Sequence, residues 1–133
     1  MLLPSLFVIS SNGWSGSCNI GSFTSSQLVL MPTRGSSSNM AFSMQCEQNY
    51  QIRFSSMNGV NGVNGTLMGQ NGTSIRTQMK VTNEQGSLPW NNTIQQVANQ
   101  RNQYILTVSI LDSISSSLPA GKYTDRVSVM IDY

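Results

Sequence analysis

The feature that most constrains the fold of this sequence is the strict alternation of its last stretch, Tyr123–Tyr133. One set of alternate positions is mostly apolar and comprises Tyr123, Asp125, Val127, Val129, Ile131 and Tyr133. A period of two predicts a β-strand that buries one face. The strand runs to the last residue, where a chain end usually frays unless other segments hold it. We therefore expect another strand to lie against it.

Four other segments alternate in the same way: 40–46, 50–56, 74–82 and 103–111, with a weaker one at 27–31. Their predicted inward side chains are Met40, Phe42, Met44, Cys46, Tyr50, Ile52, Phe54, Ile75, Met79, Val81, Tyr104, Leu106, Val108 and Ile110. This pattern is typical of antiparallel sheets with one face on a core. The nearest approach to a helical period is 91–103, where we expect at most one short helical turn.

Six short strands predict a β-sandwich of the immunoglobulin type, which normally has about seven strands. One strand is therefore missing, and an incomplete sandwich leaves an apolar groove beside an unpaired sheet edge. Such an edge can instead accept a strand from another chain. The predicted fold is all-β: an incomplete immunoglobulin-like antiparallel β-sandwich that lacks one strand and is completed by a donor strand.

The composition argues against several classes of function. Charged residues make up only 9% of the chain, and the seven basic residues are scattered, so no nucleic-acid-binding patch is predicted. There is no histidine, and the five acidic residues form no close pair, which argues against an enzyme. Two cysteines alone cannot hold zinc. We expect no cofactor and no metal.

Cys18 and Cys46 are the two cysteines, and we interpret them as one disulfide, the alternative being two unrelated buried thiols. The bridge would close a loop of about 29 residues and contribute roughly 3–4 kcal/mol in the chain-entropy model. It implies an oxidising compartment.

The N-terminal segment, residues 1–13, leaves two interpretations open. Its continuous apolar run Leu6–Ile9 fits the core of a signal peptide, although the usual positive charge is missing. Alternatively, the segment is an N-terminal donor strand, although a donor strand should alternate. It is too short to span a membrane as a helix. Residues 14–133 are then the sandwich domain.

Two tryptophans and one repeat remain. Trp14 and Trp90 are candidate surface contacts, and a lid over the core is the alternative for Trp90. The Asn-Gly repeat over 58–74 is expected to be a surface loop, with a ligand loop as the alternative.

The ending "LPAGKYTDRVSVMIDY" resembles the spore coat protein U domain family, the subunits of archaic chaperone–usher pili. The matching positions are Pro119, Ala120, Gly121, Tyr123, Asp125, Val127, Val129, Ile131 and Tyr133. The spacing of Cys18 and Cys46 and the strand "YQIRF" also fit, whereas the Asn-Gly repeat matches no family feature. The resemblance spans about Cys18 to Tyr133.

The resemblance implies an exported, pilin-like subunit that passes through the periplasm to a cell-surface fibre. A periplasmic chaperone would lend a strand beside the last strand, and an outer-membrane usher would exchange it for the N-terminal extension of a neighbouring subunit. Val127, Val129, Ile131 and Tyr133 would line the acceptor groove. Pro119 and Gly121 would belong to the turn into the strand. Tyr123 would anchor that turn in the core, beside Asp125.

A tip or adhesive position follows if residues 1–13 are a signal, because such a subunit accepts a strand but gives none. A host or abiotic surface would then be a partner. The alternative function is a stand-alone secreted module that binds carbohydrate or a surface and needs no partner strand.

Overall fold

A computed structural model describes residues 3–12, 18–21, 27–31, 34–58, 65–69, 72–113, 121 and 123–133. Eleven strands occur among these residues, and none of the described residues forms an α-helix. The rarity of charged and helix-favouring residues and the period-two patterns explain this outcome. The described part of the chain contains no helix long and apolar enough to cross a membrane.

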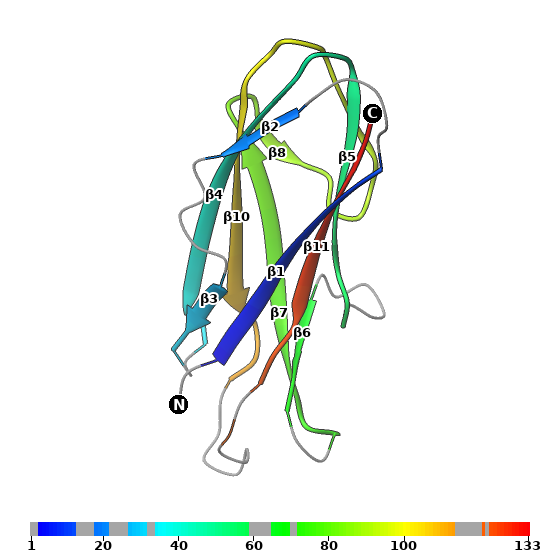
Figure 1. The fold of residues 1–133 in the computed structure, drawn as a ribbon. Coiled ribbons are helices and arrows are strands. Elements are labelled where there is room, and N and C mark those ends of the chain that lie inside the picture. Colours follow the sequence, from blue (N-terminus) through cyan, green and yellow to red (C-terminus); the bar gives the residue numbers. More distant parts are fainter. Residues whose placement is uncertain are drawn as a thin grey trace.

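The strands form two sheets (Figure 1). The first sheet has the spatial order β3 (Gln27–Leu30), β1 (Leu3–Asn12), β11 (Arg126–Asp132), β5 (Tyr50–Ser56) and β9 (Ile94–Gln96). The second has the order β2 (Cys18–Gly21), β4 (Ser37–Cys46), β10 (Asn102–Ile110), β7 (Ser74–Asn83) and β6 (Gly65–Met68), and β8 (Gly86–Leu88) pairs with β7. The predicted all-β, immunoglobulin-like sandwich is confirmed.

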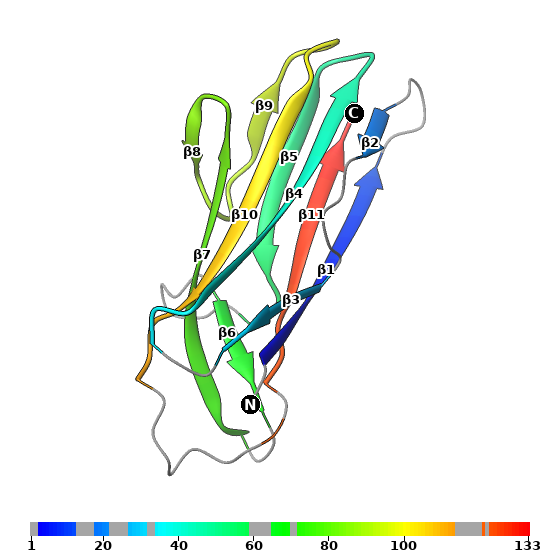
Figure 2. The same ribbon diagram turned by 90° about the vertical axis from the view of Figure 1, so that its left-hand side faces the viewer.

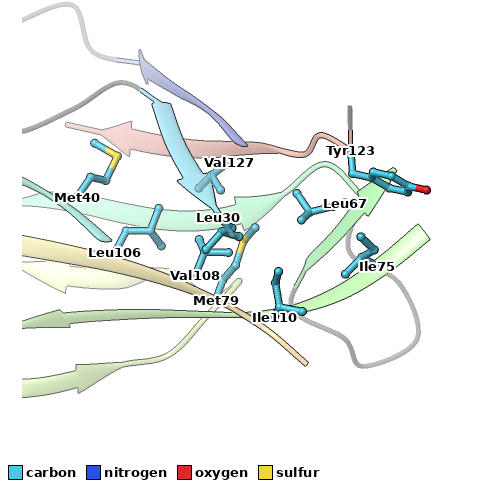
Figure 3. Packing of buried hydrophobic residues seen from close by; sticks show 10 residues of the cluster. All are labelled: Leu30, Met40, Leu67, Ile75, Met79, Leu106, Val108, Ile110, Tyr123 and Val127. Carbon is cyan, nitrogen blue, oxygen red and sulfur yellow. The ribbon is translucent and has the colours of Figure 1, made fainter. Parts of the chain in front are cut away.

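The core lies between the sheets and consists of the predicted faces. All fourteen side chains expected to point inward from the four internal strands are exposed by 2% or less. They divide into two clusters, one of which, with Leu30, Met40, Leu106 and Val127 among its members, is seen in Figure 3. Alternation is therefore a reliable signal here because each long strand has one face on the core.

Two short strands were not predicted from the sequence. The Asn-Gly repeat is not a loop throughout, because β6 lies inside it, pairs with β7 and buries Leu67 completely. Residues 91–103 contain the short strand β9 instead of a helical turn, and β9 pairs with the first half of β5. Both strands are short. β6 pairs with the next strand in the sequence and β9 with the distant β5, and this pairing outweighs weak local propensity.

The terminal strand begins later than its alternation suggests. Thr124 forms an isolated bridge with Met68 at the end of β6, whereas β11 pairs with β5 in the other sheet from Val127 onward. The chain therefore crosses from one sheet to the other at Asp125. Alternation continues through this crossing, because Tyr123, Asp125 and Val127 are all buried.

The N-terminal strand β1 lies between β3 and β11 (Figures 1 and 2). It pairs antiparallel with β3 over Leu3–Leu6 and parallel with β11 over Leu6–Asn12. This is the single parallel pair among the strands that the structure describes. Pro4, which has no backbone N–H, precedes the part of β1 that pairs with β11 and so interrupts no bond there.

Candidate functional site

The candidate site is the place in the first sheet between β3 and β11, which we call the slot. β11 forms one side of the slot whether or not β1 is in place. The inward side chains Val127, Val129 and Ile131 are exposed by 1%, 0% and 0%. Val127 belongs to one core cluster, and Val129 and Ile131 to the other. Tyr133, the last of the predicted groove residues, is half-buried and packs against the second cluster.

β1 occupies the slot in this structure. Its register on β11 places Phe7 opposite Val127, Ile9 opposite Val129 and Ser11 opposite Ile131. Leu6–Ile9 does not alternate, and the sequence therefore argued against a donor strand here. In the structure every residue of this segment nevertheless pairs with β11. Backbone hydrogen bonds supply the pairing in a sheet, and they do not require an alternating sequence.

The entry to β11 is fixed by the buried carboxylate of Asp125, which is exposed by 3%. The hydroxyl of Ser56 and the backbone N–H groups of Asn58 (3.1 Å), Thr66 (3.4 Å) and Arg126 (2.7 Å) all donate to this carboxylate. A buried charge is costly unless hydrogen bonds compensate it, and here four donors do so. The carboxylate therefore holds the ends of β5 and β6 against the start of β11.

The Asn58 side chain strengthens the same junction. Its amide nitrogen donates to the carbonyl oxygens of Thr66, at 3.1 Å, and Thr124, at 3.0 Å. Asn58 therefore links three segments with its side chain and its backbone. No pattern in the sequence indicated Asn58, Ser56 or Thr66 as partners of Asp125. The available signal was Asp125 itself, because a carboxylate on the apolar face of a strand requires nearby donors.

The turn before β11 is built on glycine and tyrosine. Gly121 has a φ of +148°, a conformation that L side chains rarely adopt. Tyr123 is buried to 1% exposure in the first cluster. Gly69 lies against its ring, since a Cβ on Gly69 would come within 2.5 Å of Tyr123 Cε2. Pro119 and Trp14 lie outside the described residues.

At the C-terminal end of β11 the surface holds a cavity lined mainly by polar residues. A cavity of about 300 Å³ is lined by Asn49, Tyr50, Gln51, Gln95, Asp132 and Tyr133. Beneath it, the phenol oxygens of Tyr50 and Tyr104 lie 2.7 Å apart, and Asn102 Nδ2 donates to Tyr50 at 3.2 Å. Burial raises the pKa of both phenols above the ordinary value, and for Tyr104 the hydrogen bond with Tyr50 adds to the effect.

The predicted disulfide is present and ties β2 to the end of β4. Cys18 and Cys46 are direct partners in the register of these strands, with their Cα atoms 4.0 Å apart. The neighbouring hollow, of about 240 Å³, is lined by Asn19, Ile20, Gly21, Ser43, Met44, Gln45 and Arg101. Arg101 Nη2 donates to the Ser43 hydroxyl at 3.3 Å.

Trp90, a candidate surface contact, is half-buried and packs against both core clusters. Its ring is stacked on that of Phe54, with the centroids 6.5 Å apart. Its part in any surface contact stays a prediction. Among the described residues no three His, Cys, Asp or Glu side chains gather in a way that could hold a metal ion.

The sequence matches no family model and no curated protein. The structure is similar to a chain in the crystal structure of the CsuC–CsuE chaperone–tip adhesion subunit pre-assembly complex, from the archaic chaperone–usher Csu pili of Acinetobacter baumannii. The TM-score is 0.55 at 15% sequence identity. The similarity covers 90% of this chain but only 40% of that one, so this chain spans less than half the length of its structural neighbour. At this identity the similarity establishes a common fold.

Proposed function

We propose that this protein is a pilin-like structural subunit of a chaperone–usher surface fibre, assembled by donor-strand complementation. The observation that carries the proposal is the slot. β11 pairs with β5 on one side. On the other side it pairs in parallel with β1, which comes from the opposite end of the chain. Without β1, β11 would present an unpaired edge, and an extended strand from another chain can pair with such an edge. The pattern of the last strand and the common fold point the same way.

In this proposal the partners are a periplasmic chaperone, an outer-membrane usher and neighbouring subunits. The subunit is exported through the periplasm to a cell-surface fibre. Val127, Val129, Ile131 and Tyr133 form the accepting face, and residues 1–13 are the strand that a subunit gives. The disulfide supports export, because such bonds persist mainly in oxidising compartments.

An adhesive role is the finer proposal, and the surface of the described residues supports it. Met31, Met57, Met68 and Leu111 are exposed by 59%, 66%, 40% and 40%. Met31, Met57 and Leu111 directly follow β3, β5 and β10, and Met68 is the last residue of β6. These strand ends lie at the end of the sandwich away from the C-terminus of β11 (Figure 1). Four of the seven large apolar side chains exposed among the described residues therefore lie near this end, and clustered exposed apolar side chains are typical of contact surfaces.

The fibre proposal is tested on the surface fraction sheared from cells that make the protein. Strand-exchanged subunits are held by a full backbone ladder, so we expect multimers that resist detergent in the cold and collapse to monomer on boiling. The matched variants are Val129→Asp, in the accepting face, and Asp132→Asn, on the exposed side of the same strand. V129D should lose the multimers and D132N should keep them. Monomer alone in the culture medium would contradict the proposal.

A stand-alone secreted module is the second candidate, and one observation favours it. β1 completes the sheet within a single chain, so a lone domain has no open edge beside β11. The same sheared-surface experiment separates the two candidates, because a stand-alone module stays monomeric.

A further inference from the structure

The direction of β1 is informative because it depends on where the strand comes from. Cys18 begins β2 and is bonded to Cys46, at the end of β4. From Cys46 the chain reaches Tyr50 after a short turn, and the next residue, Gln51, lies opposite Asp132. The disulfide therefore anchors the chain after β1 at the end of the sandwich where β11 finishes.

This anchor limits how β1 can lie if it belongs to the same chain. Asn12 and Cys18 are separated by six Cα–Cα steps, which span at most about 21 Å. In the observed parallel pairing Asn12 lies opposite Asp132, close to the anchored end. Asn12 and Cys18 therefore both lie at the end of the sandwich where β11 finishes.

An antiparallel β1 in the same chain would place Asn12 near the start of β11. The strand Arg126–Asp132 spans about 20 Å, and the two sheets lie about 10 Å apart. Together these lengths put Asn12 about 22 Å from Cys18. Six Cα–Cα steps reach that distance only when they are fully extended. A strand from another chain has no such tether and can run either way. Parallel pairing is therefore the arrangement that a strand from the same chain adopts without a fully stretched connection.

We propose that β1 is an intramolecular cap: in the free chain, residues 3–12 close the chain's own slot, and another strand enters only after β1 has left. The second clause rests on the proposed function; the first does not. Both edges of β1 are bonded, to β3 and to β11, so its release breaks two ladders and limits the rate of exchange.

The test places cysteines at Ser10 and Met130, which are direct partners in the parallel register. The described chain has no free thiol to compete, and a short bis-maleimide joins the two engineered ones. The matched control is S5C/M130C. It shares the Met130 change, but Ser5 lies about 17 Å further along β1. Circular dichroism and an intact Cys18–Cys46 bond establish that both variants are folded.

We expect S10C/M130C to cross-link within the monomer at low micromolar concentration, as judged by intact mass, and S5C/M130C not to. Cross-linking of the control in place of the test pair overturns the parallel cap. Cross-links between copies, or none in either folded variant, overturn capping within the chain. These three outcomes concern the monomer alone. The proposed function is tested separately, by the detergent-resistant multimers.

A second readout measures gating. If β1 must leave, the cross-linked S10C/M130C monomer should form no detergent-resistant multimers, whereas the same variant without cross-linker should form them. Multimers from the cross-linked monomer would overturn the gating clause and leave the fibre proposal standing.

Discussion

The phenol groups of Tyr50 and Tyr104 share a hydrogen bond of 2.7 Å in the core, one from each sheet of the sandwich. Both side chains are exposed by 1% or less. The bond therefore joins the sheet that holds the slot to the sheet that holds the disulfide. Asn102 Nδ2 donates to Tyr50, whereas the buried Asn102 Oδ1 has no hydrogen-bond partner among the described residues.

The free energy of unfolding should fall as pH rises above about 10. Burial raises the pKa of both phenols in the folded protein, whereas in the unfolded chain they titrate near the ordinary value of about 10. Above that pH the unfolded state holds fewer protons than the folded state, so alkali favours unfolding. Urea midpoints at successive pH values measure the effect. The Y50F/Y104F variant should show a flatter profile, and an identical slope would contradict the assignment.

Replacing Asp125 by Asn should lower the free energy of unfolding by about 2–4 kcal/mol, because the amide turns one acceptor into a donor facing N–H groups. Urea denaturation measures the change. Asp132→Asn is the control: this carboxylate is exposed on the same strand, and its replacement should change stability by less than about 0.5 kcal/mol. Equal losses of unfolding free energy in the two variants would show that the buried hydrogen bonds of Asp125 do not add to stability.

Gly69→Ala should be destabilising by about 1–3 kcal/mol, because the added Cβ would press on the buried ring of Tyr123. Gly21→Ala provides the comparison, since a Cβ there meets nothing within 4 Å. Thermal melts of the two variants give the result. We expect a lower Tm for G69A and an unchanged Tm for G21A; a pair of unchanged melts would mean that β6 yields freely beside Tyr123.

The C18S/C46S variant should lose roughly 3–4 kcal/mol of stability, because the bridge closes a loop across a sequence separation of 28 and restricts the unfolded chain. The measurement is urea denaturation with and without reductant. Reductant should move the natural protein towards the variant and leave the variant itself unchanged. If reduction leaves the natural protein's midpoint in place, the bridge does not contribute to stability.

The sequence predicted the long strands and their inward faces because each has one side on the core. β5 was predicted at its observed bounds, Tyr50–Ser56. Alternation in the last stretch correctly identified Asp125 and Val127 as neighbours on one face. This information is local, since the period of side chains along a strand depends only on its own backbone.

The rest of the site depends on contacts between segments far apart in the sequence. The donors to Asp125 come from positions 56, 58 and 66 as well as its neighbour, and no local pattern links them. Met68, at the end of β6, forms a bridge with the distant Thr124. The direction of β1 follows from the tether to Cys18, which is a property of the folded chain.

The parallel pairing of β1 and β11 also has a mechanical consequence. β1 begins at one end of the sandwich and β11 finishes at the other (Figure 1), so tension between the two ends pulls these strands in opposite directions along their axes. All bonds between them then bear load together, in shear, whereas an antiparallel pair pulled from one end would open one bond at a time. Resistance to forced unfolding depends on the height of that barrier. The closed chain is thus built to withstand stretching along its length.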